Sequence, residues 1–248
     1  ETPMQKPFSY VKDNMRNFYK TGTEMNNVIG LRYGTDKLGI VASYGNLTSN
    51  GILPNDGDTY SRNTFSLRGN AKVDKFSFDM SMNYVRKDIR RTSGMENELL
   101  QHAVDVSYAD MKDYNDERYN LDNYYTHYAT NPYWMIDNNY QKYQDDRIYG
   151  KIEMSYDILK GLRATGRLGG DFLNYRKEKI LAKTVFSDGS YSKDGGATPD
   201  PGEYHNFRNT TGQIDATLYL SADYTLGDFT LGGSAGWNLN QRVYSYAG

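Results

Sequence analysis

The chain has 248 residues, 24% of them charged, with a formal net charge of −2. Its mean hydropathy of −0.81 is typical of a soluble protein, and it lacks the basic stripe of a nucleic-acid binder. The absence of cysteine excludes disulfides and thiolate-metal sites. No apolar run approaches the roughly 20 residues of a membrane helix. The N-terminal residues carry no signal peptide, so we expect either a processed terminus or an internal piece of a longer chain.

Eight segments, arranged as four hairpins, alternate apolar and polar residues with period two. Such alternation gives a β-strand one apolar face and one polar face. The expected strands are Asn26–Gly34, Leu38–Asn46, Asn63–Val73, Phe76–Tyr84, Asp146–Tyr156, Leu162–Tyr175, Gly212–Tyr224 and Phe229–Asn240. The expected hairpin turns are residues 35–37, 74–75, 157–161 and 225–228.

Three long insertions connect the hairpins: Leu47–Ser61, Lys87–Asp145 and Arg176–Thr211. Short turns at one end, long loops at the other and strands of about ten residues are typical of an outer-membrane β-barrel. Such a barrel can be polar overall because only alternate residues face lipid. A soluble β-sandwich also alternates, but these strands are long for one. We therefore expect a transmembrane barrel with its short turns in the periplasm and its insertions outside the cell.

The alternation also predicts which way the side chains face. Seven apolar residues expected to face lipid are Phe65, Leu67, Phe78, Met80, Ile152, Leu218 and Leu231. The charged residues of the opposite face would line a lumen or contact a plug domain, and they are equally compatible with a plain solvated face. They are Arg62, Arg68, Lys72, Asp79, Arg147, Lys151, Glu153, Arg163, Arg167 and Asp171.

The middle insertion is too long for a simple connection and should hold structure of its own. Residues 93–96 resemble a capping box that opens a helix through Leu99, Leu100, Ala103 and Val104, and it could extend to Met111. Pro132 restricts Asn131 to extended geometry, which suits a fixed turn at the base of the loop.

Nine of the 24 tyrosines lie between residues 101 and 144, beside Trp134. Aromatic rings on a loop can stack on sugar rings or peptide side chains, although packing within the loop is the plainer role for any one of them. The candidate substrate or partner residues are Tyr124, Tyr125, Tyr128, Tyr133 and Trp134.

No catalytic constellation is visible, and we expect neither an enzyme nor a bound cofactor or metal. The three histidines, His102, His127 and His205, lack ligand spacing. Residues 55–59 are rich in oxygen ligands but lack the closing Glu of a calcium-binding loop, so a solvated turn is expected. The glycines of residues 166–170 precede no helix and form no phosphate-binding loop.

Three stretches, in order, resemble the SusC/RagA-type TonB-dependent transporters of the Bacteroidota outer membrane. The first is Asn17-Phe18-Tyr19-Lys20-Thr21-Gly22, followed by Asn26-Asn27. The second is Ser43-Tyr44-Gly45-Asn46-Leu47-Thr48-Ser49-Asn50-Gly51-Ile52-Leu53-Pro54-Asn55, followed by Arg62-Asn63-Thr64. The third is Asn131-Pro132-Tyr133-Trp134, followed by Asp145-Asp146-Arg147-Ile148-Tyr149-Gly150.

The resemblance implies a 22-stranded barrel closed inside by a plug. It also implies import of oligosaccharides or peptides, with a SusD-like surface lipoprotein as cap and TonB as the energy source. This chain shows no TonB box, no plug and too few strands, so we expect residues 1–248 to be part of one barrel domain of a larger transporter. The alternative is a complete eight-stranded barrel that serves as an adhesin or structural protein. An outer-membrane enzyme is the least favoured reading, because no nucleophile and base are paired.

Overall fold

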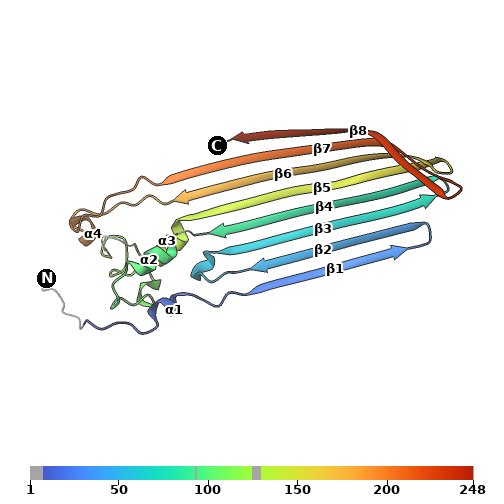
Figure 1. The fold of residues 1–248 in the computed structure, drawn as a ribbon. Coiled ribbons are helices and arrows are strands. Elements are labelled where there is room, and N and C mark those ends of the chain that lie inside the picture. Colours follow the sequence, from blue (N-terminus) through green and yellow to red (C-terminus); the bar gives the residue numbers. More distant parts are fainter. Residues whose placement is uncertain (1–7, 93, 125–129, 248) are drawn as a thin grey trace.

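The computed structural model describes residues 8–92, 94–124 and 130–247. Its main element is one antiparallel sheet of eight strands in sequence order, with loops and short helices gathered at one end (Figure 1). The strands are β1 (Glu24–Gly34), β2 (Leu38–Ser49), β3 (Thr59–Val73), β4 (Phe76–Arg91), β5 (Tyr140–Leu159), β6 (Leu162–Leu181), β7 (Glu203–Leu226) and β8 (Phe229–Ala247). The predicted all-β antiparallel architecture with four hairpins is confirmed.

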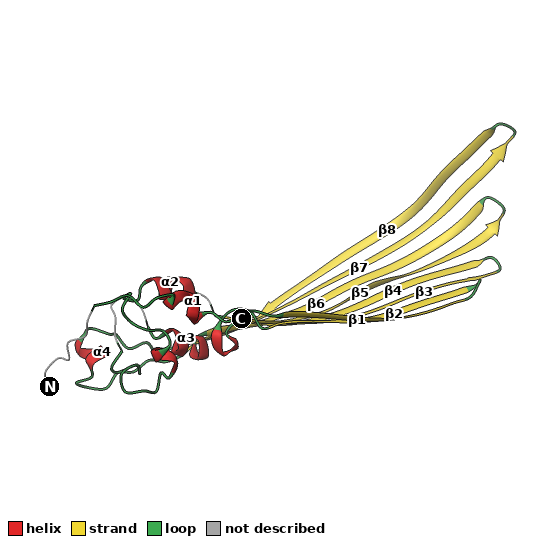
Figure 2. Ribbon diagram, turned by 90° about the horizontal axis from the view of Figure 1, so that it is seen from below, coloured by secondary structure: helices red, strands yellow, loops and turns green. Residues whose placement is uncertain are grey.

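All four hairpin turns lie at the end of the sheet opposite the helices, as the alternation of short and long connections predicts (Figures 1 and 2). Two of them are tighter than expected. β5 continues to Leu159 through a register shift between Asp157 and Leu159, which leaves a two-residue turn with Gly161 at φ 82°. β7 continues to Leu226, and Gly227 at φ 61° begins the other two-residue turn. Glycine adopts these left-handed conformations without a steric penalty.

At the loop end the strands run beyond their predicted limits. β4 continues to Arg91, β5 begins at Tyr140, β6 continues to Leu181 and β7 begins at Glu203. The insertions between strands are correspondingly shorter, at residues 50–58, 92–139 and 182–202. The added residues are mostly polar on both faces, so alternation could not reveal them, although the backbone ladder continues.

The strand registers bring the apolar residues at the predicted alternating positions of all eight strands to one face. Phe78 pairs with Met154, and Met80 pairs with both Gly69 and Ile152. The last apolar row on this face crosses the whole sheet: Ile29, Tyr44, Phe65, Tyr84, Ile148, Phe172, Gly212 and Val243. A one-residue slip at any pair would move a strand's apolar residues to the other face, so the registers and the sequence pattern agree.

The next row on this face, toward the loops, is entirely polar. It consists of Asn27, Asn46, Asn63, Arg86, Asp146, Asn174, Thr210 and Ser245. Two tyrosines of the apolar row reach across to it: the Tyr44 hydroxyl donates to Asn63 Oδ1 at 2.6 Å, and the Tyr84 hydroxyl donates to Asp146 Oδ1 at 2.7 Å. The apolar face therefore ends in rings whose polar tips bond to the polar row.

The helices are short and belong to the loops: α1 (Asn14–Phe18), η1 (Pro54–Asp56), α2 (Met95–Leu100), η2 (Asp110–Lys112), α3 (Pro132–Asn138) and α4 (Tyr191–Asp194). The sequence analysis indicated one of these helices and did not indicate the others. The predicted helix is α2, but it ends at Leu100, and Met111 lies in η2. Its N-cap is Gly94, which makes no side-chain capping bond, and Ser93 lies outside the described residues. No helix of the described ranges is long and apolar enough to cross a membrane.

The sheet is open. Among the described residues β1 pairs only with β2 and β8 pairs only with β7, so the eight strands do not close on one another. The largest hydrophobic side chains of the sheet are exposed, and the buried core lies among the loops instead. Two bare edges and an exposed apolar face are what a segment cut from a larger barrel presents.

Candidate functional site

The long-loop end holds a packed unit, here called the loop cluster, made of the described parts of residues 8–23, 50–58, 92–139 and 182–202. Its core consists of Phe18, Leu53, Met95, Leu99, Tyr108, Met111, Tyr133 and Ile136. These residues come from α1, α2, η2, α3 and the segments beside them, so remote parts of the chain are held together by apolar burial. The loops at this end of the sheet therefore form one folded platform.

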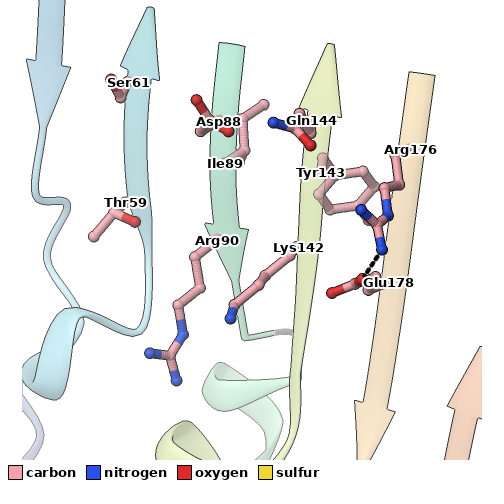
Figure 3. Close-up of a pocket in the computed structure, with 10 residues that line it drawn as sticks. All are labelled: Thr59, Ser61, Asp88, Ile89, Arg90, Lys142, Tyr143, Gln144, Arg176 and Glu178. Carbon is pink, nitrogen blue, oxygen red and sulfur yellow. Dashed lines mark ion pairs between the residues drawn. The ribbon is translucent and has the colours of Figure 1, made fainter. Parts of the chain in front are cut away.

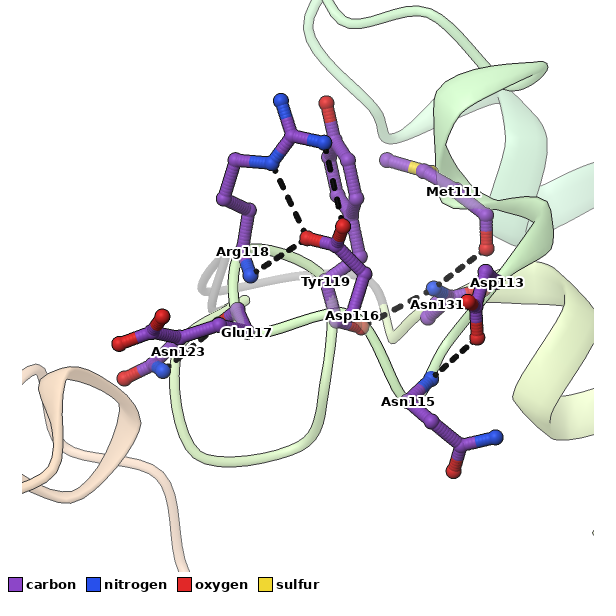
Figure 4. Close-up of polar contacts among 9 residues, drawn as sticks. All are labelled: Met111, Asp113, Asn115, Asp116, Glu117, Arg118, Tyr119, Asn123 and Asn131. Atoms are coloured by element: carbon purple, nitrogen blue, oxygen red, sulfur yellow. Dashed lines mark hydrogen bonds and ion pairs between the residues drawn. The ribbon is translucent and has the colours of Figure 1, made fainter.

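Asn131 ties the middle insertion together from within. It is 1% exposed. Its side-chain oxygen accepts from the Tyr133 amide at 3.0 Å, which caps α3, and its Nδ2 donates to the carbonyls of Met111 and Tyr119 (Figure 4). Asn131 has ψ 118°, as expected of a residue before proline, and Pro132 occupies the first turn of α3. The predicted fixed turn is therefore the start of a capped helix.

The N-terminal segment is joined to the same platform, which the sequence reasoning missed. Asn14 Nδ2 donates to the Val106 carbonyl at 2.6 Å, and Asn14 Oδ1 accepts from the Tyr108 amide at 2.9 Å. The Phe18 ring packs against Tyr133, with ring centroids 5.1 Å apart. The Asn17–Gly22 stretch was noticed only for its resemblance to other sequences, and no local signal showed that Phe18 packs on a ring more than a hundred residues away.

The candidate aromatic residues fall into different positions. Tyr133 is 5% exposed and belongs to the core. Tyr124 is half-buried and stacks on His102, with centroids 5.7 Å apart and planes 9° from parallel. Trp134 is half-buried but is not among the side chains packed against that core. Tyr125 and Tyr128 lie outside the described residues. The structure thus brings Tyr124 and Tyr133 to one core, and it leaves part of Trp134 accessible.

Burial changes the acid–base properties of the groups around Tyr124. It raises the pKa of the Tyr124 phenol and lowers the pKa of His102, because the charged form of each is poorly solvated. His102 Nδ1 lies 2.7 Å from the Glu98 carbonyl oxygen and therefore carries the donated proton. Burial also raises the pKa of the Glu98 carboxyl, which accepts from the Thr130 amide. Burial therefore disfavours the charged form of each of these three groups.

The oxygen-rich turn at residues 55–59 stabilises the loop itself. Asp58 accepts from the amides of Ile52 and Leu53 at 3.0 and 2.7 Å, and Asp56 pairs with Lys20 at 2.8 Å. The hydrogen bond and charge of Lys20 lower the pKa of the Asp56 carboxyl. No group of three or more metal-ligating side chains occurs among the residues that the structure describes.

The polar face of the sheet carries a lattice of cross-strand ion pairs. Lys151 lies 3.5 Å from Asp79 and 3.9 Å from Glu153, and Arg167 pairs with Glu153 at 2.7 Å. Arg147 pairs with Asp171, and Arg163 pairs with Asp157. The structure thus connects most of the predicted charged residues of this face. Each exposed pair contributes at most about 1 kcal/mol to the stability of the fold. The main effect of these pairs is therefore to make this face of the sheet polar.

A polar hollow lies on the other face of the sheet, the one that carries the apolar rows, between the last apolar row and the loops. The sequence analysis did not predict it. It has a volume of about 350 Å³ and lies across β3 to β6 (Figure 3). The charged residues that line it are Asp88, Arg90, Lys142, Arg176 and Glu178. They belong to the strand extensions that alternation could not reveal.

Comparison with known proteins shows the fold. No family model matches the chain, and no curated protein matches it significantly. A solved structure described as the RagAB peptide transporter superposes with a TM-score of 0.70 at 14% identity, covering 96% of this chain and 27% of its own. The same system in an "open-open" state gives 0.68 at 14% identity, covering 94% and 26%.

A ferric-catecholate import receptor of E. coli, Fiu, gives a TM-score of 0.53 at 8% identity, covering 93% of this chain and 34% of its own. The chain therefore spans about a quarter to a third of the length of the structures that it matches. At these identities the comparisons establish the architecture alone: the eight-stranded antiparallel sheet is arranged like part of these transporter and receptor structures.

Proposed function

We propose that this chain forms part of the wall and the extracellular loops of a TonB-dependent importer in the outer membrane. The observation that carries the proposal is the apolar face that runs in register across all eight strands and ends at one polar row. A surface of this kind suits contact with lipid, and the polar face with its ion pairs suits an aqueous lumen or a plug. The similarity to solved importers supports the same reading.

The finer assignment is to the SusC/RagA type. It is supported by the three sequence stretches that resemble that type and by the superposition on the RagAB peptide transporter. In this assignment a SusD-like lipoprotein caps the loop cluster, and TonB acts through a plug domain. The substrate is an oligosaccharide or a peptide, and peptides are the class named for the RagAB structures.

The loop cluster is the part of the chain proposed to meet the substrate or the capping lipoprotein. Trp134, Tyr125 and Tyr128 supply the contacting rings, whereas Tyr133 lies in the core of the loop cluster and Tyr124 packs against that core. A stacked ring contributes about 0.5–1.5 kcal/mol beyond area burial, so single substitutions can escape detection. The informative variant therefore replaces Tyr125, Tyr128 and Trp134 together by alanine.

Two alternatives are less well supported. A complete eight-stranded adhesin or structural barrel requires β1 to pair with β8, and the described strands form an open sheet. An enzyme lacks support because the structural neighbours are described as transporters and receptors.

The experiment is uptake of labelled peptides and labelled oligosaccharides by cells that lack the full-length protein. Complementation with the wild type should restore uptake of one class, and the threefold aromatic variant should restore it less while reaching the surface in equal amount. Tyr191→Ala is the matched control, because it removes an exposed ring from the same cluster. Unchanged uptake of both classes in the deletion strain would refute the proposed importer function. Full rescue by the aromatic variant would show that those rings only pack within the loop.

A further inference from the structure

The polar hollow on the apolar side of the sheet lies where an importer wall would emerge from the membrane. Arg90 is six residues beyond Tyr84 of the last apolar row on β4, and Lys142 is six residues beyond Ile148 on β5. Both strands still present the same face at these positions, since side chains alternate with period two. The hollow is therefore on the outer surface of the wall, on the extracellular side of the apolar band.

Two of the three cations that line this hollow, Arg90 and Lys142, lie side by side with no carboxylate between them, and Glu178 is the direct partner of Lys142 on the next strand. Arg90 and Lys142 are direct cross-strand partners, and like charges in that position are destabilising. Both contact the same ring, with Arg90 Cζ 4.4 Å and Lys142 Nζ 5.1 Å from the centroid of Tyr140. Figure 3 shows both side chains pointing toward the loop end. They concentrate positive charge at one place.

The two carboxylates that line the hollow each form an ion pair with an arginine of their own strand. Glu178 pairs with Arg176 at 2.8 Å, and Asp88 pairs with Arg86 at 3.1 Å. The opposite face offers a contrast: the directly paired acids Asp79 and Glu153 are bridged by Lys151. No corresponding anion bridges Arg90 and Lys142 among the described residues.

Hydrogen-bond donors in the hollow are also unused. Arg90 Nε and Arg176 Nε are both buried and have no acceptor among the described residues. Arg90 is held in place by its Nη2, which donates to the Ile136 carbonyl at 2.9 Å. Thr59 and Ser61 line the same hollow with hydroxyl groups. Two guanidinium donors, an ammonium and two hydroxyls are a donor set suited to phosphate oxygens.

We propose that this hollow binds a phosphorylated sugar of the glycolipid that forms the outer leaflet of the membrane. The occupant is a lipid and not a free anion because the site is on the lipid-facing side of the wall, above the apolar band that would hold the acyl chains. The inference rests on the proposed membrane placement of the sheet. It adds a lipid site to the wall, separate from the lumen and from the substrate.

The test uses the full-length protein, purified in detergent, and rough lipopolysaccharide as the probe. Lys142→Gln should lower binding about fivefold, and Arg90→Gln with Lys142→Gln should lower it roughly tenfold or more, because each basic residue adds attraction to an anionic headgroup. The Lys142 side chain donates no hydrogen bond to the described residues, so its substitution should leave the fold intact. Lys177→Gln is the matched control: Lys177 also lies over a tyrosine ring, 5.5 Å from the centroid of Tyr143, but on the polar face.

Three results would overturn the inference. They are equal binding by the wild type and the double variant, equal loss in Lys177→Gln, and equal wild-type binding of lipopolysaccharide whose phosphates have been removed. Displacement of the lipid by millimolar inorganic phosphate, with no preference for the lipid form, would indicate a free-anion site and would also overturn it. Surface labelling and uptake measured on the same variants separate a failure of this site from a failure of the proposed importer.

Discussion

At the residue scale, the face that a side chain occupies should decide whether a charge is tolerated. Ile152 lies on the apolar face between Met80 and Leu168, whereas Ser155 lies on the polar face of the same strand, flanked by Glu153 and Asp157. Lysine at a mid-membrane lipid position costs about 2–4 kcal/mol in such barrels. We expect Ile152→Lys to reduce the amount of heat-resistant, folded protein in the outer membrane, and Ser155→Lys to leave it near the wild-type level. Equal tolerance of the two substitutions would contradict the assigned faces.

His102 should make the loop cluster sensitive to pH. Its folded-state pKa is lowered below 6.5 by burial, so between that pKa and 6.5 the unfolded state binds more protons and stability falls as the pH falls. Glu98, whose pKa is raised, has the opposite effect. Its protonation favours the folded state, and this contribution is lost as the pH rises above 4.5.

The effect of the histidine is isolated by comparison with His102→Gln, whose amide can still donate to the Glu98 carbonyl but does not titrate near neutrality. We expect the protection factors of the Val106 and Tyr108 amides against hydrogen exchange to fall more between pH 7 and 5 in the wild type than in the variant. Tyr108 and Tyr124 are the other rings that contact His102, and neither titrates in this range. Identical pH profiles would show that burial of His102 does not control the cluster.

At the scale of elements, α3 depends on one buried amide. Asn131→Ala removes the cap of α3 and leaves the carbonyls of Met111 and Tyr119 without their donor. Loss of an N-cap costs about 0.5–2 kcal/mol, and each buried unsatisfied group costs about 1–3 kcal/mol. We expect protease to cut residues 101–124 much faster in this variant while the barrel stays assembled. Asn123→Ala, which removes an exposed asparagine bond to Glu117 in the same insertion, should change the cutting rate little.

The strands were predictable because one physical constraint acts on every second residue. Phe65, Met80 and Leu218 each had to face the same way, and period-two alternation shows this directly. Beyond the apolar band no residue has to be apolar, so alternation could not predict the strand extensions that carry Arg90 and Lys142. The lengths of the turns at Gly161 and Gly227 were overestimated, because β5 and β7 continue to the last residue before each turn.

The loop cluster was less predictable because its helices have four to seven residues and little periodicity of their own. Their stability comes from tertiary contacts, such as Phe18 on Tyr133, which no local pattern encodes. The aromatic candidates were chosen by composition, which cannot distinguish a buried ring from an accessible one. The structure makes that distinction for Tyr133 and Trp134.

At the scale of the whole molecule, the sheet and the loop cluster have opposite characters. The sheet exposes its apolar side chains and leaves both edges unpaired. Its surroundings must therefore supply the apolar contacts that a buried core would otherwise provide. The loop cluster buries its apolar side chains within itself. A molecule built in this way is suited to two environments, lipid around the sheet and water around the loops.

That division predicts which residues can be reached from outside the cell. The present chain has no cysteine, so single cysteines introduced into it can be followed with a membrane-impermeant maleimide. Asn115 is exposed in the loop cluster, and its side chain makes no hydrogen bond to the described residues, whereas Lys75 lies in a hairpin turn at the opposite end of the sheet (Figure 1). We expect Asn115→Cys to be labelled on intact cells and Lys75→Cys to be labelled only after the outer membrane is permeabilised. Labelling of Lys75→Cys on intact cells would reverse the orientation. Equal labelling of both positions before and after permeabilisation would show that the sheet does not separate two compartments.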